Sequence, residues 1–366
     1  MDMHRLLSAF DPDSGPYVMA TVIHTVGHAY RKRGSAMILG LDGTKTGSIS
    51  PGCLETDLQE RAPCVWDSGQ AQIVGYNLQP EEDAVWGEAL GCGGEIRILL
   101  EPVQGELRRQ LLDAKKTLDG RRSVRFIRRR LEDGRIAYAA VHLPSAASGE
   151  PGILLEEKGG GDEMLTFDWH PQPRLLLFGA GDDSIPIARL AMQSGFAVTV
   201  ADWRSGLCTP ERYPGSQLMV GRPEEIASAF KLGVNDYVVV CSHQLERDRR
   251  MIELALAAGA RYIGVMGSKK RIALLLGEER PSNVYAPIGC SIGAEGADEI
   301  AVSVAAELIA VHRGAENGGR KGAGADEAVR RLFGRGTKPE NGAAEAFHEA
   351  AGWNAARSYG ASCSIR

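Results

Sequence analysis

The stretch RLLLFGAGDDSIPIARLAMQSGFAVTVAD, residues 174–202, decides the fold of the C-terminal half of the chain. An apolar strand ends in glycines, an amphipathic helix follows, and a second apolar strand ends in an acid. In a Rossmann unit the first glycine, here Gly179, permits the tight turn, and the second, Gly181, lets a phosphate approach the backbone. Ser184 is small enough for the helix to pack closely. Asp202 ends the second strand, where an acid binds a ribose hydroxyl.

The alternation of strands and helices continues beyond this stretch. Strand followed by helix, repeated along the chain, is typical of a doubly wound parallel sheet. We therefore predict an α/β fold with a Rossmann-like domain over residues 173–313. Its further strands and helices are expected at 217–221, 222–232, 236–242, 245–258, 261–267 and 297–312.

The sequence does not decide whether the residues around the glycine turn bind a ligand or have only structural roles. Asp182 and Asp183 stand where a pyrophosphate would bind and would repel it, so they either cap the helix or hold water. His243 follows the fourth strand, which lies beside the first in the usual strand order, and so borders the crevice that receives ligands. Its imidazole could donate to an anion or pass a proton, or it could simply cap the helix at 245–258.

A second cluster of glycine and cations follows the fifth strand. Gly267 and Ser268 precede Lys269, Lys270 and Arg271 at the start of a helix. This order suits a phosphate or another polyanion. The alternative is a solvated basic helix start.

The N-terminal half shows a different organisation, with hairpins in place of alternating strands and helices. Tight turns at Asp42-Gly43 and Asp133-Gly134 join apolar or charged strands. We predict a mixed α/β domain over residues 1–143, a linker over 144–172, and a flexible Gly/Ala-rich tail over 314–366. The expected strands are 18–26, 36–41, 95–100, 122–131 and 134–143, and the expected helices begin at 53 and 103.

Two cysteines stand beside glycines in this half. Cys53 follows Gly52 at the mouth of a helix, whose field lowers the pKa of a thiol placed there. Such a thiolate could pass sulfur, ligate a soft metal or act as a nucleophile. Cys92 precedes Gly93 in GCGG and is the natural second thiol. Each could equally be a small buried hydrophobe.

Composition excludes several classes of protein. The 366 residues contain 42 basic and 47 acidic side chains, a net charge of −5, which lacks the basic surplus of a nucleic-acid binder. The seven cysteines show no close pairing, which argues against a disulfide framework or a zinc ribbon. No apolar run reaches membrane-spanning length, and the first residues lack the apolar core of a signal peptide, so we expect a cytoplasmic protein.

Ordered motifs along residues 18–313 resemble the XdhC/CoxI family, the accessory proteins of xanthine dehydrogenase and related molybdenum hydroxylases. Pro51, His28, Tyr30 and Cys290 depart from the residues usual in that family. The resemblance rests on ATVIHTVGHAYRKRGSAMIL, GTKTGSISPGCLETDL, WGEALGCGGEIRILLEPV, RLLLFGAGDDSIPIARLAMQSGFAVTVADWR, VVVCSHQLERD, ARYIGVMGSKKR and APIGCSIGAEGADEIAVSVAAELIAVHRG.

The resemblance implies a chaperone that binds the molybdenum cofactor, molybdopterin, assists its sulfuration by a cysteine desulfurase, and hands it to an apo-hydroxylase. By position, Cys53 corresponds to the cysteine of the family's GGC motif and Cys92 to that of its GCGG motif. The glycine loops at Gly52, Gly93 and Gly181 would supply backbone donors, with the cofactor between them and the Rossmann crevice. The resemblance also implies a homodimer. The rival interpretations are an NAD(P)-dependent oxidoreductase and a scaffold without any cofactor.

Overall fold

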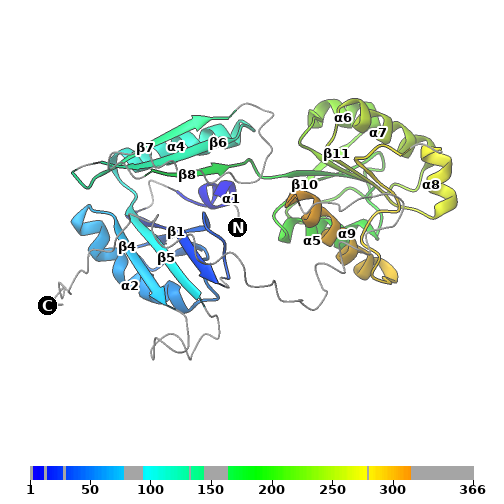
Figure 1. The fold of residues 1–366 in the computed structure, drawn as a ribbon. Helices are drawn as coiled ribbons and strands as arrows, with labels where there is room; N and C mark the ends of the chain where they lie inside the picture. The colour runs from blue at the N-terminus through cyan, green and yellow to red at the C-terminus, as the bar shows by residue number, and fades with distance from the viewer. Residues whose placement is uncertain are drawn as a thin grey trace. The chain divides into compact units, whose positions relative to one another are not determined.

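The computed structural model describes residues 3–11, 15–27, 30–77, 94–131, 133–143, 164–277 and 280–314. The chain divides into two compact units, with the boundary between Pro171 and Gln172 (Figure 1). The N-terminal part is called unit 1 below and the C-terminal part unit 2. The predicted tail beyond 314 lies outside the described residues.

Unit 2 contains a six-stranded sheet in which all paired strands are parallel. The strand order β11-β10-β9-β12-β13-β14 places the first strand of the unit beside the fourth, which is the Rossmann order. The predicted Rossmann-like fold is thus confirmed. The strands are β9 (Arg174–Phe178), β10 (Ala197–Asp202), β11 (Gln217–Val220), β12 (Tyr237–Val240), β13 (Tyr262–Val265) and β14 (Val284–Tyr285).

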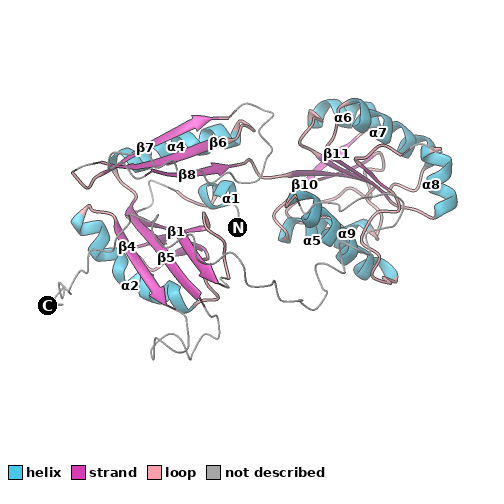
Figure 2. Cartoon of the chain, in the orientation of Figure 1, coloured by secondary structure: helices cyan, strands magenta, loops and turns pink. Residues whose placement is uncertain are grey.

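Helices cover both faces of this sheet (Figure 2). Along β9, Leu175 and Leu177 pack with one set of helices, whereas Leu176 and Phe178 pack with the other. Alternate residues of a strand point to opposite faces, so a fully apolar strand requires cover on both sides. The first face carries α5 (Ser184–Gln193) and α9 (Gly296–His312), and the second carries α6 (Pro223–Phe230), α7 (Leu245–Ala257) and α8 (Lys269–Leu276).

Unit 1 contains a five-stranded antiparallel sheet with the order β3-β2-β1-β5-β4. The hairpin predicted at Asp42-Gly43 joins β2 to β3, as Met37 pairs with Gly47. Helix α2 packs on one face of the sheet, and α1 and α4 pack on the other. The elements are α1 (Met3–Ser8), β1 (Tyr17–Gly27), β2 (Ala36–Gly40), β3 (Lys45–Gly47), α2 (Cys53–Ser68), β4 (Gln72–Asn77), β5 (Gly94–Pro102) and α4 (Gly105–Asp119).

A second, three-stranded sheet with the order β7-β6-β8 completes unit 1. The predicted hairpin at Asp133-Gly134 joins β6 (Val124–Arg130) to β7 (Ile136–His142). Strand β8 (Met164–Trp169) lies inside the stretch predicted as linker, so that prediction is wrong for these residues. The reason is burial: the Trp169 ring stacks on Phe126 of β6 with the ring centres 4.3 Å apart, which a linker composition does not reveal.

Between the two sheets of unit 1 lies an ion pair that is almost completely buried. Arg128 of β6 binds Glu101 of β5, with side chains 1% and 0% exposed. Such a pair is costly to break, because removing one partner leaves a buried charge without compensation.

Candidate functional site

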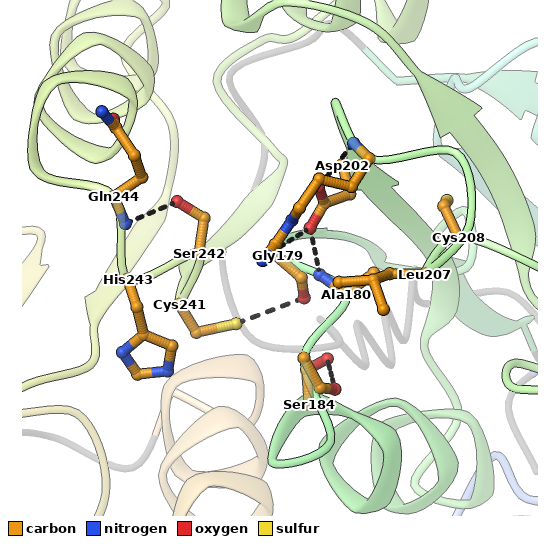
Figure 3. Close-up of polar contacts among 12 residues, drawn as sticks. Gly179, Ala180, Ser184, Asp202, Leu207, Cys208, Cys241, Ser242, His243 and Gln244 are labelled. Atoms are coloured by element: carbon orange, nitrogen blue, oxygen red, sulfur yellow. Dashed lines mark hydrogen bonds and ion pairs between the residues drawn. The ribbon is translucent and has the colours of Figure 1, made fainter.

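The glycine turn after β9 is shaped by close contact with β12. Gly179 has a φ of +124°, and a Cβ added there would lie 2.5 Å from backbone atoms of Cys241 and Ser242. Figure 3 shows Gly179 beside these two residues. The predicted glycine therefore serves the packing of two adjacent strands at the point where the strand order reverses.

Asp202 is buried and fully engaged within the protein (Figure 3). Its Oδ2 accepts the Ala180 amide at 2.7 Å, and its Oδ1 accepts the Arg204 amide at 2.8 Å. The Arg204 guanidinium binds both carboxylate oxygens, at 2.8 and 2.9 Å. Burial raises the pKa of Asp202, but the bonds from Arg204 and Ala180 outweigh it, and the net pKa lies below the ordinary value. This arrangement does not present the carboxylate to a ribose.

The two acids of the glycine turn are each paired with a basic side chain. Arg212 Nη2 lies 2.8 Å from Asp182 Oδ1, and His243 Nε2 lies 2.8 Å from Asp183 Oδ2. Asp183 makes no side-chain capping bond to α5, so the capping alternative is not what the structure shows. His243, whose φ of +62° is unusual for a residue with a side chain, lies beside the glycine turn, and its predicted role toward a ligand stays a prediction.

Two hydroxyl groups fix the turn from the other side: that of Tyr213, which sequence reasoning missed, and that of Ser184, which was expected only to allow close packing. The hydroxyls of Tyr213 and Ser184 donate to the Gly181 carbonyl at 2.9 and 2.8 Å. Within the described ranges, the backbone N–H groups of Gly181, Asp182 and Asp183 donate no hydrogen bond. The turn is therefore rigid and presents free donors at the start of α5.

The Trp203 ring contacts two arginines, one that follows β10 and one in the helix that follows β12. The guanidinium carbons of Arg204 and Arg247 lie 4.5 and 4.3 Å from the centre of the Trp203 ring. Trp203 follows the strand-ending acid, and Arg247 lies in the first turn of α7. The engagement of Asp202 by Arg204 and Ala180 disfavours a dinucleotide, and the contact between Trp203 and Arg247 had no signal in the sequence.

Of the three cations after β13, Arg271 forms an ion pair, whereas Lys269 and Lys270 form none among the described residues. Ser242 and Arg271 both bind Asp248, with Arg271 Nη2 2.6 Å from Asp248 Oδ2, which ties β12 to α7 and α8. Lys269 and Lys270 are exposed and form no ion pair in the part of the chain described. Of this cluster, these two remain available to an anion.

Gly267 and Ser268, in the same motif, have structural contacts. A Cβ on Gly267 would lie 2.7 Å from Cδ of Arg271, and the Ser268 hydroxyl accepts the Arg271 amide at 3.3 Å as the N-cap of α8. Their predicted binding roles, like that of Lys269, stay predictions.

In unit 1, the loop before α2 is held by one buried carboxylate. Glu55, 6% exposed, accepts the amides of Ile49 and Ser50 at 2.9 and 2.7 Å, and the Ser50 hydroxyl donates to its other oxygen. Ser50 Oγ in turn accepts the amides of Gly52 and Leu54 at 3.2 and 3.1 Å. The residues on both sides of Cys53 are thereby fixed.

This loop places Cys53 as the first residue of α2. Gly52 has a φ of +135°, with open space where a Cβ would be, so the conformation of the backbone alone requires glycine. The predicted helix start is confirmed, and Cys53 occupies a helix N-terminus, the position at which the helix field favours anionic groups.

Cys92 and Gly93 lie outside the described residues. Among the described residues, Asn77 pairs with Glu95 and Gly27 with Gly94 at one end of the sheet. Tyr76, next to that end, donates a hydrogen bond to Asp57, one turn after Cys53. The first turn of α2 thus lies beside the end of the sheet at which β4 ends and β5 begins.

Comparisons with known proteins agree with this architecture. Residues 13–77 match the model of the XdhC and CoxI family, and residues 175–308 match the XdhC Rossmann domain. Among curated proteins, a probable xanthine dehydrogenase subunit of Bacillus subtilis (strain 168) is 33% identical over 84% of this chain and 97% of its own length. The molybdenum cofactor insertion chaperone PaoD of Escherichia coli (strain K12) is 25% identical over 80% of this chain and 83% of its own length.

Among solved structures, a protein of Bacillus halodurans described as a xanthine dehydrogenase is 34% identical. The match has a TM-score of 0.75 and covers 88% of this chain and 98% of the other. The described helices include none long and apolar enough to cross a membrane. Sequence motifs, strand order and relatives agree, and the chain belongs to the XdhC and CoxI family.

Proposed function

We propose that the protein binds the molybdenum cofactor, assists its sulfuration, and helps insert it into xanthine dehydrogenase or a related molybdenum hydroxylase. The observation that carries the proposal is Cys53 at the start of α2, in a loop that Glu55 and Ser50 hold in one conformation. The relation to a molybdenum cofactor insertion chaperone supports the same function. The hydroxylase and a cysteine desulfurase are the proposed partners, and a homodimer the proposed assembly.

The residues of unit 2 fit a pterin better than a dinucleotide. A pterin ring presents N–H groups, which pair with carboxylates, and carbonyl and ring-nitrogen acceptors, which pair with N–H donors. The glycine turn offers both kinds of partner: the Asp183 carboxylate beside His243, and the free amides of Gly181 and Asp182. Lys269 and Lys270 are exposed cations that follow β13, two strands away from β9 in the same sheet.

The cofactor itself would supply a molybdenum–dithiolene centre whose metal accepts a sulfur ligand. The groups of the glycine turn would orient the pterin, and Cys53 is proposed separately as the thiol that handles sulfur. Cys53 would attack the outer sulfur of a persulfide on the cysteine desulfurase, so that the S–S bond breaks, the desulfurase thiol leaves and Cys53 carries the sulfur.

Copurification tests this function. The chain is produced in a host that makes molybdopterin, and bound pterin is measured by its fluorescence after oxidation. We expect a stoichiometric signal for the native chain and a reduced one for Cys53→Ala. Cys64→Ala is the matched control, because Cys64 is an exposed thiol on the same helix. No pterin on the native chain, or equal amounts on all three proteins, would contradict the proposal.

A further inference from the structure

Two arginines in the loop between β1 and β2 have no acidic partner among the described residues. Arg31 Nη2 donates to the Ser48 hydroxyl at 3.1 Å, and Arg31 lies over the Tyr30 ring at 5.7 Å. Arg33 forms no hydrogen bond or ion pair in the described part of the chain. Nearby, Arg97 is paired with Glu95 at 2.7 Å, which is the usual arrangement for a guanidinium.

Both unpaired guanidinium groups are partly removed from water. The Nε atoms of Arg31 and Arg33 are buried without a hydrogen-bond partner. Burial also lowers the pKa of Arg33. Burying a charged donor without a partner costs free energy, which an anion bound beside it would recover.

The surroundings hold these arginines at a defined place. The loop is anchored to β1, because the Gly34 amide donates to the Val22 carbonyl and the Val22 amide to that of Ser35, both at 2.8 Å. Burial, with the charges of Arg97 and Arg33, lowers the pKa of His24 on β1, although Glu95 opposes the effect. His24 is therefore neutral near pH 7 and can donate a hydrogen bond without adding charge.

The bond from Arg31 to Ser48 connects this cluster to the loop before α2. Ser48 lies two residues before Ser50, which caps the loop that leads to Cys53. The unpaired cations and the first turn of α2 thus lie at the same end of unit 1, and both favour a negative ligand.

We propose that Arg31 and Arg33 bind a tetrahedral oxyanion at this end of unit 1. The planar guanidinium presents two parallel N–H groups, which match two oxygens of such an anion. Its source is either the phosphate monoester of the pterin ligand, an assignment that rests on the proposed function, or a free oxyanion such as phosphate or molybdate.

Thermal unfolding of the full chain at constant ionic strength tests the site. A ligand that binds only the folded state raises the melting temperature as its concentration increases. We expect inorganic phosphate to raise it more than chloride does. Arg33→Gln should weaken the apparent phosphate affinity about tenfold or more, because it removes charge-assisted hydrogen bonds.

Two further measurements separate binding from structure and from general charge. Lys32→Gln removes one charge from an exposed residue of the same loop and should retain the phosphate response. Without phosphate, Arg33→Gln should melt no lower than the native chain, because it removes an uncompensated cation. Three results would overturn the proposal. The native chain and Arg33→Gln could respond equally to phosphate, or Lys32→Gln and Arg33→Gln could lose the phosphate response equally. The third is a melting temperature of Arg33→Gln below that of the native chain without ligand.

The source of the anion is identified with phenyl phosphate and molybdate. Tighter binding of phenyl phosphate than of inorganic phosphate assigns the site to a monoester, and equal or tighter binding of molybdate assigns it to a free oxyanion. A phosphate response without pterin copurification would refute the proposed function and keep this site. If pterin copurifies equally with the native chain and Arg33→Gln, and phosphate gives no response, the site is refuted and the proposed function is kept.

Discussion

Replacement of Glu55 by alanine tests whether one carboxylate holds the loop before Cys53. Glu55 is buried and accepts bonds from two backbone amides and one hydroxyl. Alanine removes all three acceptor contacts at once and leaves the amides of Ile49 and Ser50 without their partner. The Ser50 hydroxyl also loses the bond that orients it toward the amides of Gly52 and Leu54.

The expected cost follows from these contacts. A hydrogen bond to a charged group contributes about 1.5–3 kcal/mol, and bonds that share one carboxylate are not additive. We therefore expect a loss of about 3 kcal/mol in the free energy of unfolding of unit 1. For a domain of this size, that lowers the melting temperature by about 6–12 °C.

Two assays measure the effect of Glu55→Ala, one on the whole protein and one on the loop before α2. Thermal unfolding gives the global loss, and native-state hydrogen exchange at the amides of Ile49 and Ser50 reports the loop itself. Glu60→Ala is the matched control, because Glu60 is an exposed acid on the same helix and should change stability by less than about 0.5 kcal/mol. Equal melting temperatures of the two variants, with unchanged exchange, would refute the role of Glu55.

The same residue predicts a dependence on pH. Burial raises the pKa of Glu55, but the bonds from Ser50 and Ile49 outweigh it, so the folded-state pKa lies below the ordinary 4.5. The stability it contributes is present above that ordinary value and is lost as the pH falls through the lower folded-state value. The difference between the native chain and Glu55→Ala should therefore be full at pH 7 and shrink as the pH falls below 4.5.

Three other predictions follow from close contacts and buried charges. Gly179→Ala should cost more than about 4 kcal/mol or prevent folding, because its Cβ would clash with the backbone of β12, whereas Gly206→Ala has open space and should be neutral in urea denaturation. Arg128→Met should cost about 3–5 kcal/mol by leaving Glu101 buried and unpaired, and adding Glu101→Leu should recover most of that loss. Asp202→Asn should lower the free energy of unfolding by about 2 kcal/mol at pH 7. NADH fluorescence should show no saturable binding to the native chain. Saturable binding that Asp202→Asn weakens would restore the oxidoreductase interpretation.

Several features of the candidate site could be predicted because they depend on local order in the chain. The glycine turn follows an apolar strand and precedes an amphipathic helix, which places Gly179 and His243 together once the strands take the Rossmann order. The helix start at Cys53 follows from a proline, a glycine and a helical pattern in sequence. Other roles were not predictable, because Asp202 has the position of a ribose ligand until the side chain of Arg204 is placed against it.

The sequence by itself determined the two kinds of architecture, the parallel unit and the hairpin unit, because the period of apolar residues and the turn residues specify elements and their order. It also determined family membership through its ordered motifs. Only the tertiary structure decided which charged side chains form ion pairs and which do not. Asp202 is paired with Arg204, whereas Arg33 has no partner among the described residues. The physical reason is that ion pairing and burial depend on the positions of side chains in three dimensions, and residues far apart in sequence, such as Glu101 and Arg128, meet only after the sheets have packed.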